Sequence, residues 1–215
     1  MEKRTVTYIE HVLKCEGYWV CDKDDAGGET YRGISRRAHP NWEGWEIVDA
    51  HKPLKKNQKI DSPELEKSII EFYDEKYYRP SKAHLINNNV IAAHVFDHSV
   101  NAGIKAGAKI LQKAINAVTH KGIDVDGIIG NVTLSFANNA AYSDRIAKEI
   151  VSQRNAFYTN IVEKNKTQAK FLNGWLNRVK NTTKMAEAYV EPIVSDPEPI
   201  IAENEDDKKK VSMDV

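Results

Sequence analysis

The sequence predicts a mostly α-helical protein of 215 residues with one small loop or β-hairpin region. Several stretches carry apolar residues every three to four positions, which is the spacing of an amphipathic helix. Residues 17–36 are instead rich in glycine and aspartate, which favour turns. A hydrophobic fraction of 41% at this length is enough to bury a core, in one sizeable domain or two small ones.

The first helix is expected over residues 5–16. Its apolar side chains follow the helical period, and Glu16 falls on the same face as Ile9 and Leu13. A carboxyl group therefore lies at the end of an apolar stripe. The apolar positions of this helix are Val6, Ile9, Val12 and Leu13.

The next part of the chain should contain few regular elements. Residues 17–36 are expected as an irregular loop or short hairpin, and residues 37–60 as rich in loops. A helix should then begin at Ser62, because a hydroxyl N-cap followed by Pro63 at the first helical position stabilises a helix start. Pro80 should end it.

The C-terminal half should be helical apart from a loop over residues 122–130. The long helix should have Ser143 as its N-cap. From about residue 190 the chain is rich in acid and proline and too poor in apolar residues to offset its ordering entropy, so we expect a disordered acidic tail over 190–215. The other expected helices cover residues 90–100, 105–117 and 131–139 and a last segment from Phe171 to Val179.

Charge is divided unevenly along the chain. The whole sequence has 31 basic and 31 acidic residues, but the part from Val190 onward holds eight acidic residues and three lysines. The preceding part is therefore mildly basic, which suits an anionic polymer such as peptidoglycan with its teichoic acids, or a nucleic acid. The lysines are scattered and form no basic face with interleaved aromatic residues, so we expect no nucleic-acid partner.

The N-terminus shows no secretory signal. Met1 to Arg4 are followed by mixed polar and apolar residues, and no apolar run approaches the roughly 18 residues of a membrane span. We therefore expect a chain made in the cytoplasm without a membrane anchor. If its target is the cell wall, a holin or a dedicated export route must release it.

Metal and thiol chemistry are not expected. Cys15 and Cys21 are the only cysteines, and two such residues make neither a disulfide framework nor a metal motif, so we expect reduced, packing thiols. His94 and His98 lie four residues apart, but Val95 stands where the zinc-protease motif H-E-x-x-H needs glutamate. We predict no metal and no cofactor.

Asp97 and Asn101 lie four residues apart on one expected helix. Side chains at this spacing share a helix face. We expect the pair to brace the structure.

Glu16 is the most informative residue, because it lies where the apolar helix face meets the loop rich in aspartate and glycine. Burial against apolar groups favours the protonated form of a carboxyl group, as a general acid near neutral pH requires. Cleavage of a glycosidic bond needs such an acid and a second group that stabilises the oxocarbenium-like state or places water. The segment thus suits a sugar-cleaving cleft.

The same segment carries a spaced motif. It reads Glu-Gly-Tyr-Trp at 16–19, Gly-Gly-Glu-Thr at 27–30 and Gly-Ile-Ser at 33–35, with aspartates between the first two parts. This resembles the glycoside hydrolase family 108 muramidases, lysozyme-like endolysins and secretion activators, whose pattern is roughly E-G-G-Y, a D-rich segment and G-G-x-T-x-x-G-I-[ST]. Tyr18 departs from the pattern, standing at the usual second glycine, and Trp19 stands at the usual tyrosine.

Further motifs extend this resemblance to about residues 3–180. It implies a lysozyme-like hydrolase domain at 1–102 and a helical peptidoglycan-binding domain at 103–182 packed on it. The motifs similar to the rest of the catalytic domain are Tyr-Tyr-Arg-Pro at 77–80, Val-Phe-Asp at 95–97 and Asn-Ala-Gly at 101–103. Those similar to the peptidoglycan-binding domain are Ala-Lys-Ile-Leu-Gln-Lys-Ala-Ile at 108–115 and Val-Asp-Gly-Ile-Ile-Gly at 125–130.

The resemblance implies that Glu16 is the general acid, and three aspartates are candidates for the second group: Asp22, Asp24 and Asp25. Phage-type lysozymes place an aspartate nine residues after the glutamate and a threonine about six further on. Asp25 lies nine residues after Glu16, with Thr30 five beyond it. Asp24 lies eight after, with Thr30 six beyond. We expect Asp25 as the second catalytic group and Thr30 to position water; inversion and retention both remain open.

Aromatic rings near Glu16 could stack on sugar faces, although aromatic residues at this density are as often part of the core. Trp42 and Trp45 belong to this group as well. The side chains that we expect to bind substrate are Tyr18, Trp19, Asp24 and Tyr31.

The sequence therefore predicts a monomeric peptidoglycan hydrolase. Its substrate would be bacterial cell-wall peptidoglycan, cleaved as an N-acetylmuramidase does at the β-1,4 bond between N-acetylmuramic acid and N-acetylglucosamine. The alternative is a non-catalytic wall-binding or secretion-assisting protein that keeps the fold, and a weaker third is a nucleic-acid-binding protein. The first two differ at Glu16, because a mere binder would tolerate its replacement by glutamine.

Overall fold

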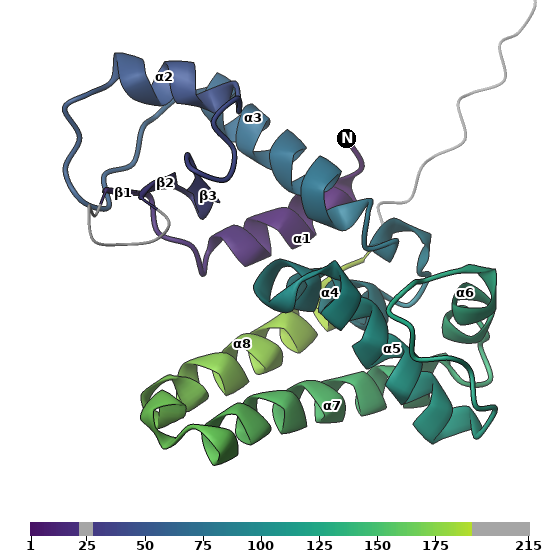
Figure 1. Ribbon diagram of the computed structural model, residues 1–215. Coiled ribbons are helices and arrows are strands. Elements are labelled where there is room, and N and C mark those ends of the chain that lie inside the picture. Colours follow the sequence, from purple (N-terminus) through teal and green to yellow (C-terminus); the bar gives the residue numbers. More distant parts are fainter. Residues whose placement is uncertain (22–27, 191–215) are drawn as a thin grey trace, which may run out of the picture.

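The computed structural model describes residues 1–21 and 28–190. In this part of the chain eight α-helices accompany one three-stranded antiparallel sheet. The predicted mostly helical fold class is therefore confirmed. Figure 1 shows the sheet together with α1, α2 and α3 in the upper half of the molecule, and α5 to α8 in the lower half.

Helix α1 (Lys3–Leu13) ends three residues earlier than predicted. Its apolar face is buried, with Ile9 and Leu13 at most 1% exposed. The backbone N–H of Glu16 donates to the carbonyl of Leu13 in the turn that follows. Glu16 thus comes after the helix and does not belong to it.

The predicted hairpin region forms a small sheet in the order β1-β2-β3. Trp19 pairs with Tyr31, and Thr30 pairs with both Val20 and Ser35. Directly paired residues share one face of a sheet, so Trp19 and Tyr31 lie on one face and Thr30 lies on the other. The strands are β1 (Trp19–Cys21), β2 (Glu29–Tyr31) and β3 (Ile34–Ser35).

The prediction that 37–60 is rich in loops missed α2 (Gly44–Ala50). At seven residues this helix is too short to show a clear apolar period. It carries Trp45 and Val48, which are 3% and 0% exposed in the common core. Tertiary packing, more than local preference, stabilises so short a helix.

Helix α3 (Pro63–Tyr73) begins as predicted, because the Ser62 hydroxyl accepts a hydrogen bond from the N–H of Leu65. The chain continues as one π-helical turn, η1 (Asp74–Tyr78), before Pro80. A single π turn inside a longer helix often accompanies a functional site.

The expected helices of the C-terminal half are confirmed with small shifts at most of their ends, but the last one continues nine residues beyond Val179. Ser143 is the first residue of its helix, so it is not the N-cap. No helix or strand is present over residues 122–130, as predicted. The helices are α4 (Asn89–Ala102), α5 (Ile104–Thr119), α6 (Asn131–Ala137), α7 (Ser143–Lys164) and α8 (Ala169–Ala188), with short 3₁₀ turns at Ala83–Leu85 and Lys166–Gln168.

Helix α4 is the central element of the fold. Every residue from Ile91 to Ser99 is buried, because α4 packs against α5, α7 and α8 and also contacts α1. The buried apolar residues form one continuous cluster from α1 to α8. The two halves in Figure 1 therefore share a core around α4.

Within the described residues, no helix is both long and apolar enough to cross a lipid bilayer. The predicted tail lies outside the described residues from position 191 onward.

Candidate active site

Glu16 lies in the turn between α1 and β1, with a side chain that is 28% exposed. A β-carbon placed on Gly33 would be 3.0 Å from Glu16 Oε2 and 2.7 Å from the hydroxyl of Tyr73. Gly33 adopts φ +77°, which glycine tolerates at little cost. Because Gly33 lacks a side chain, Glu16 and Tyr73 can both lie close to the turn between β2 and β3.

Two tyrosines next to Glu16 remain neutral. The Tyr73 hydroxyl donates to the carbonyl of Arg32 at 2.8 Å. Burial and then the Glu16 carboxylate raise the pKa of Tyr73, and the same two causes raise the pKa of Tyr77. Neither phenol is a proton source near neutral pH, and Tyr73 holds the backbone beside Glu16 in place.

Arg178 approaches Glu16 from α8, the last helix of the described residues. Its Nη1 lies 3.8 Å from Glu16 Oε1, and its Nε donates to Asp97 Oδ1 at 2.8 Å. The Arg178 side chain is only 12% exposed. The candidate site thus contains a cation, Arg178, that was not predicted from the sequence.

Asp97 anchors Arg178 from α4 and is itself 1% exposed. Arg154, which is 0% exposed, donates through Nη2 to the other Asp97 oxygen. Its Nη1 lies 2.7 Å from His94 Nδ1. Burial alone would raise the pKa of Asp97, but Arg154 and Arg178 lower it. Asp97 is therefore a buried carboxylate, and the prediction that it braces the structure is confirmed.

Asn101 also braces the structure, as predicted. Its side-chain amide donates to the hydroxyl of Tyr158 on α7 at 2.6 Å. The two residues that were expected to act together on α4 thus reach α7 and α8 through different partners.

His98 lies beside Asp97 and Arg154, and its burial should make the stability of the fold sensitive to acid. The ring is completely buried, and within the described residues neither ring nitrogen has a hydrogen-bond partner. Burial and then Arg154 lower the pKa of His98 to about 3. The unfolded chain therefore binds a proton near pH 6.5 that the folded chain excludes, so stability is lost as the pH falls below about 6.5.

Replacing His98 by leucine should remove part of this loss. Between pH 7 and pH 4 the free energy of unfolding of His98→Leu should fall by about 3 kcal/mol less than that of the wild type. Urea unfolding at both pH values measures the difference. The exposed His51→Gln variant should follow the wild type. Equal acid sensitivity of His98→Leu and wild type would show that His98 is not the responsible group.

The structure also places three other residues that the sequence predicted for the site: Thr30, Tyr18 and Trp19. Thr30 is half-buried in the middle strand, on the sheet face opposite Tyr31. The indole N–H of Trp19 donates to Glu29 Oε1 at 2.8 Å, and the Arg32 guanidinium lies 4.5 Å from the centre of the Tyr18 ring. Tyr18 and Trp19 are both partly exposed, so they stay candidates for substrate binding.

Tyr31 does not fit its predicted place on a substrate-binding surface. Its side chain is 0% exposed, and its hydroxyl accepts a hydrogen bond from the N–H of Ile60 at 2.9 Å. The ring belongs to the core because it alternates with Thr30 along β2. Trp42 and Trp45, at 9% and 3% exposure, are core residues as well.

Asp22, Asp24 and Asp25 lie outside the described residues. The second catalytic group, and the expected substrate contact of Asp24, therefore stay predictions from the sequence.

Glu29 is a second glutamate in the motif, and its environment differs from that of Glu16. It accepts from Arg36 at 2.6 Å and from Lys52 at 2.8 Å, besides the bond from Trp19. Burial would raise the pKa of Glu29, but the hydrogen bonds from Lys52, Trp19 and Arg36 lower it. Arg36 and Lys52 also bind Asp49 of α2. Glu29 is thus an ionised brace between β2 and α2, unsuited to donate a proton.

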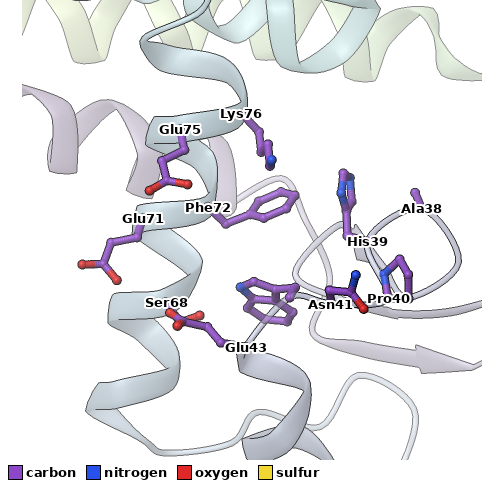
Figure 2. A pocket seen from close by; sticks show the side chains of 11 residues that line it. Ala38, His39, Pro40, Asn41, Glu43, Ser68, Glu71, Phe72, Glu75 and Lys76 are labelled. Atoms are coloured by element: carbon purple, nitrogen blue, oxygen red, sulfur yellow. The ribbon is translucent and has the colours of Figure 1, made fainter.

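A cavity of about 630 Å³ lies between α3 and the loop 38–43. Figure 2 shows Phe72 reaching from α3 toward His39, and the two rings lie 4.7 Å apart. Trp42 and Ser68 line the cavity, and their Nε1 and Oγ atoms are buried without a hydrogen-bond partner in the described residues. Glu16 does not line this cavity, but Tyr73, which follows Phe72 on α3, lies beside Glu16.

The cysteines do not pack as predicted. Cys15 and Cys21 are both free thiols, and both are exposed. The described residues contain no group of three or more histidine, cysteine, aspartate or glutamate side chains arranged to hold a metal ion.

Comparisons with known proteins agree with this architecture. Residues 9–103 match the family model described as Glycosyl hydrolase 108, and residues 106–180 match the model described as Predicted Peptidoglycan domain. A comparison with curated proteins found no match.

Among solved structures, nine chains match. One of them is the structure of Brucella abortus SagA, with a TM-score of 0.58 and 24% sequence identity over 89% of this chain and 98% of that chain. At this identity the likeness concerns the fold. Glu16, Gly33 and Tyr73 lie in the first matched region, whereas Arg178 lies in the second. The chain therefore contains a glycosyl hydrolase 108 domain over residues 9–103 and a predicted peptidoglycan domain over residues 106–180.

Proposed function

We propose that this protein is an N-acetylmuramidase that hydrolyses the β-1,4 bond between N-acetylmuramic acid and N-acetylglucosamine in peptidoglycan, with Glu16 as the general acid. The observation that carries this proposal is the position of Glu16. A partly exposed carboxyl group lies in the turn after α1 inside a glycosyl hydrolase 108 domain, beside two neutral phenols and a fixed guanidinium. The predicted peptidoglycan domain supports the choice of polymer.

Glu16 suits the role of proton donor better than the other acidic groups of the described site. Glu29 is held as a carboxylate by three donors, and Asp97 is buried between two guanidinium groups. Glu16 combines partial exposure, which lets a substrate reach it, with a guanidinium 3.8 Å away that Asp97 holds in place. Asp25, or Asp24, would supply the second group, and Thr30 would place the water.

The test is to incubate the full-length protein with purified peptidoglycan and measure the reducing ends released. Reduction of the products with borohydride followed by hydrolysis identifies the terminal sugar. We expect the reduced form of muramic acid. Reduced glucosamine would contradict the assignment of the bond. A protein that binds the wall and releases no reducing ends would contradict the hydrolase, and would favour the wall-binding or secretion-assisting alternative.

Gly33 provides a test of the geometry around Glu16. In Gly33→Ala the added β-carbon would lie 2.7 Å from the Tyr73 hydroxyl and 3.0 Å from Glu16 Oε2, at a φ of +77°. We expect the Glu16 and Tyr73 side chains to shift, and the rate of reducing-end release to fall at least about tenfold, since small displacements at a reacting centre cost up to about a hundredfold.

Gly122→Ala is the matched control. Gly122 also has a positive φ, +64°, but no atom lies within 4 Å of its added β-carbon. Both variants should lose about 1 kcal/mol of stability from backbone strain, and only Gly33→Ala should lose activity. Equal rates for the two variants would contradict the proposed contact with Glu16.

A further inference from the structure

Arg178 links the two matched regions of the chain at the candidate acid. It lies on α8 within the predicted peptidoglycan domain, whereas Glu16 lies in the glycosyl hydrolase 108 domain. In Figure 1, α8 is the yellow-green helix of the lower half, and α1 is the purple helix of the upper half. The contact of 3.8 Å between Arg178 Nη1 and Glu16 Oε1 thus joins opposite ends of the sequence.

The buried side chains of Asp97, Arg154 and Arg178 together carry a net positive charge, which faces Glu16. Asp97 provides one negative charge between Arg154 and Arg178, which are both cations. Burial, and then the guanidinium of Arg154, lower the pKa of His94 and His98, so both rings are neutral near pH 7. Asp97 therefore balances one guanidinium, and the outer one, Arg178, also faces the Glu16 carboxyl group.

The other titratable side chains near Glu16 provide no negative charge for Arg178. Burial raises the pKa of Tyr73 and of Tyr77, and partial desolvation raises the pKa of Cys15, so all three are neutral near pH 7. Arg32 is another cation of this region, and its Nη1 donates to the carbonyl of Leu13. Besides Asp97, Glu16 is therefore the acidic side chain that Arg178 faces.

Arg178 is also held rigidly. Its Nε is bound to Asp97, its Nη2 is buried without a hydrogen-bond partner in the described residues, and only 12% of the side chain is exposed. Asp97 in turn is fixed by Arg154 on α7. The guanidinium therefore has one orientation, set by α4 and α7, in which it directs Nη1 toward Glu16.

We propose that Arg178 is a positioning residue for Glu16, so that the predicted peptidoglycan domain completes the catalytic site of the hydrolase domain. This inference rests on the proposed function. Glu16 gives its proton to the bridging oxygen, which takes the electron pair of the breaking carbon–oxygen bond, and Glu16 is left as a carboxylate facing Arg178. Water then supplies a hydroxyl group to the sugar carbon and the proton that restores the acid. The nearby cation keeps the carboxyl group in its productive orientation and stabilises the charge that this step creates.

The experiment measures kcat and KM of full-length variants on peptidoglycan. Arg178→Gln and Arg178→Met both remove the charge, and Met keeps the packing of the aliphatic stem. We expect both to lower kcat at least about tenfold, with KM and wall binding within about twofold of the wild type. Arg178→Lys keeps the charge and should stay within about fivefold of the wild-type kcat. The control is Lys180→Gln, an exposed cation of the same helix, which should not change kcat.

All variants are assayed well below the lowest midpoint of thermal unfolding, so that each is folded during the measurement. A wild-type kcat in Arg178→Gln and Arg178→Met would overturn the inference and leave the proposed function intact. Equal losses in Arg178→Lys and Arg178→Gln would also overturn it, because the charge would then not matter. A wild type that releases no reducing ends would overturn the proposed function itself, which separates the two failures.

Discussion

Replacing Glu16 by glutamine should lower the rate of reducing-end release from peptidoglycan by about a hundredfold to ten-thousandfold, the range that general acid catalysis contributes. Glutamine has nearly the same shape, but its amide cannot donate a proton to the leaving oxygen. The side chain is partly exposed, so the substitution leaves the core unchanged. Binding to the wall should persist, and the loss should appear in kcat.

Glu10→Gln is the matched control for this experiment. Glu10 lies on α1 as well, but it is exposed, so the same chemical change should leave the rate within about twofold of the wild type. Sedimentation with peptidoglycan measures wall binding in parallel. If Glu16→Gln released reducing ends at the wild-type rate, Glu16 would not be the acid.

Replacing Asp97 by alanine should lower the free energy of unfolding by about 3–5 kcal/mol. The carboxylate is the counter-charge of Arg154, which is 0% exposed, and of Arg178. Without it, two guanidinium groups lie in a core with little access to water, and an unpaired buried charge is strongly destabilising. Urea unfolding, with comparison of the slopes to check two-state behaviour, measures the effect.

The exposed pair of Lys67 and Glu71 on α3 provides the contrast. These groups are 3.6 Å apart, and their side chains are 75% and 41% exposed. Glu71→Ala should therefore change stability by less than about 0.5 kcal/mol. A loss below about 1 kcal/mol in Asp97→Ala would show that water or a rearranged partner compensates Arg154 and Arg178.

Local patterns predicted most of the helices correctly. The start of α3 at Ser62 and Pro63 depends on a cap and a fixed φ, which are properties of adjacent residues. Helix α4 and the hairpin were also predictable, since apolar runs and clustered turn residues are local as well. By contrast, α2 was missed, because Trp45 and Val48 are placed by the core they enter.

The candidate site was predictable only in part. Glu16 and the motif that includes Gly33 are close in sequence, so their spacing indicated both the candidate acid and the family that the chain resembles. Tyr31 was assigned to the substrate surface because nothing in its neighbours reveals which face of β2 is buried. Asp97 was expected to brace the structure, but its partners could not be named from the sequence.

By itself, the sequence determined the fold class, the order of the helices and the candidate catalytic residue, since these follow from periodicity and short-range motifs. Only the tertiary structure decided that Tyr73 and Arg178 accompany Glu16. These contacts join α3 and α8 to the turn after α1. They depend on burial and charge balance around α4. These effects act between residues far apart in the chain, so they produce no periodic pattern in the sequence.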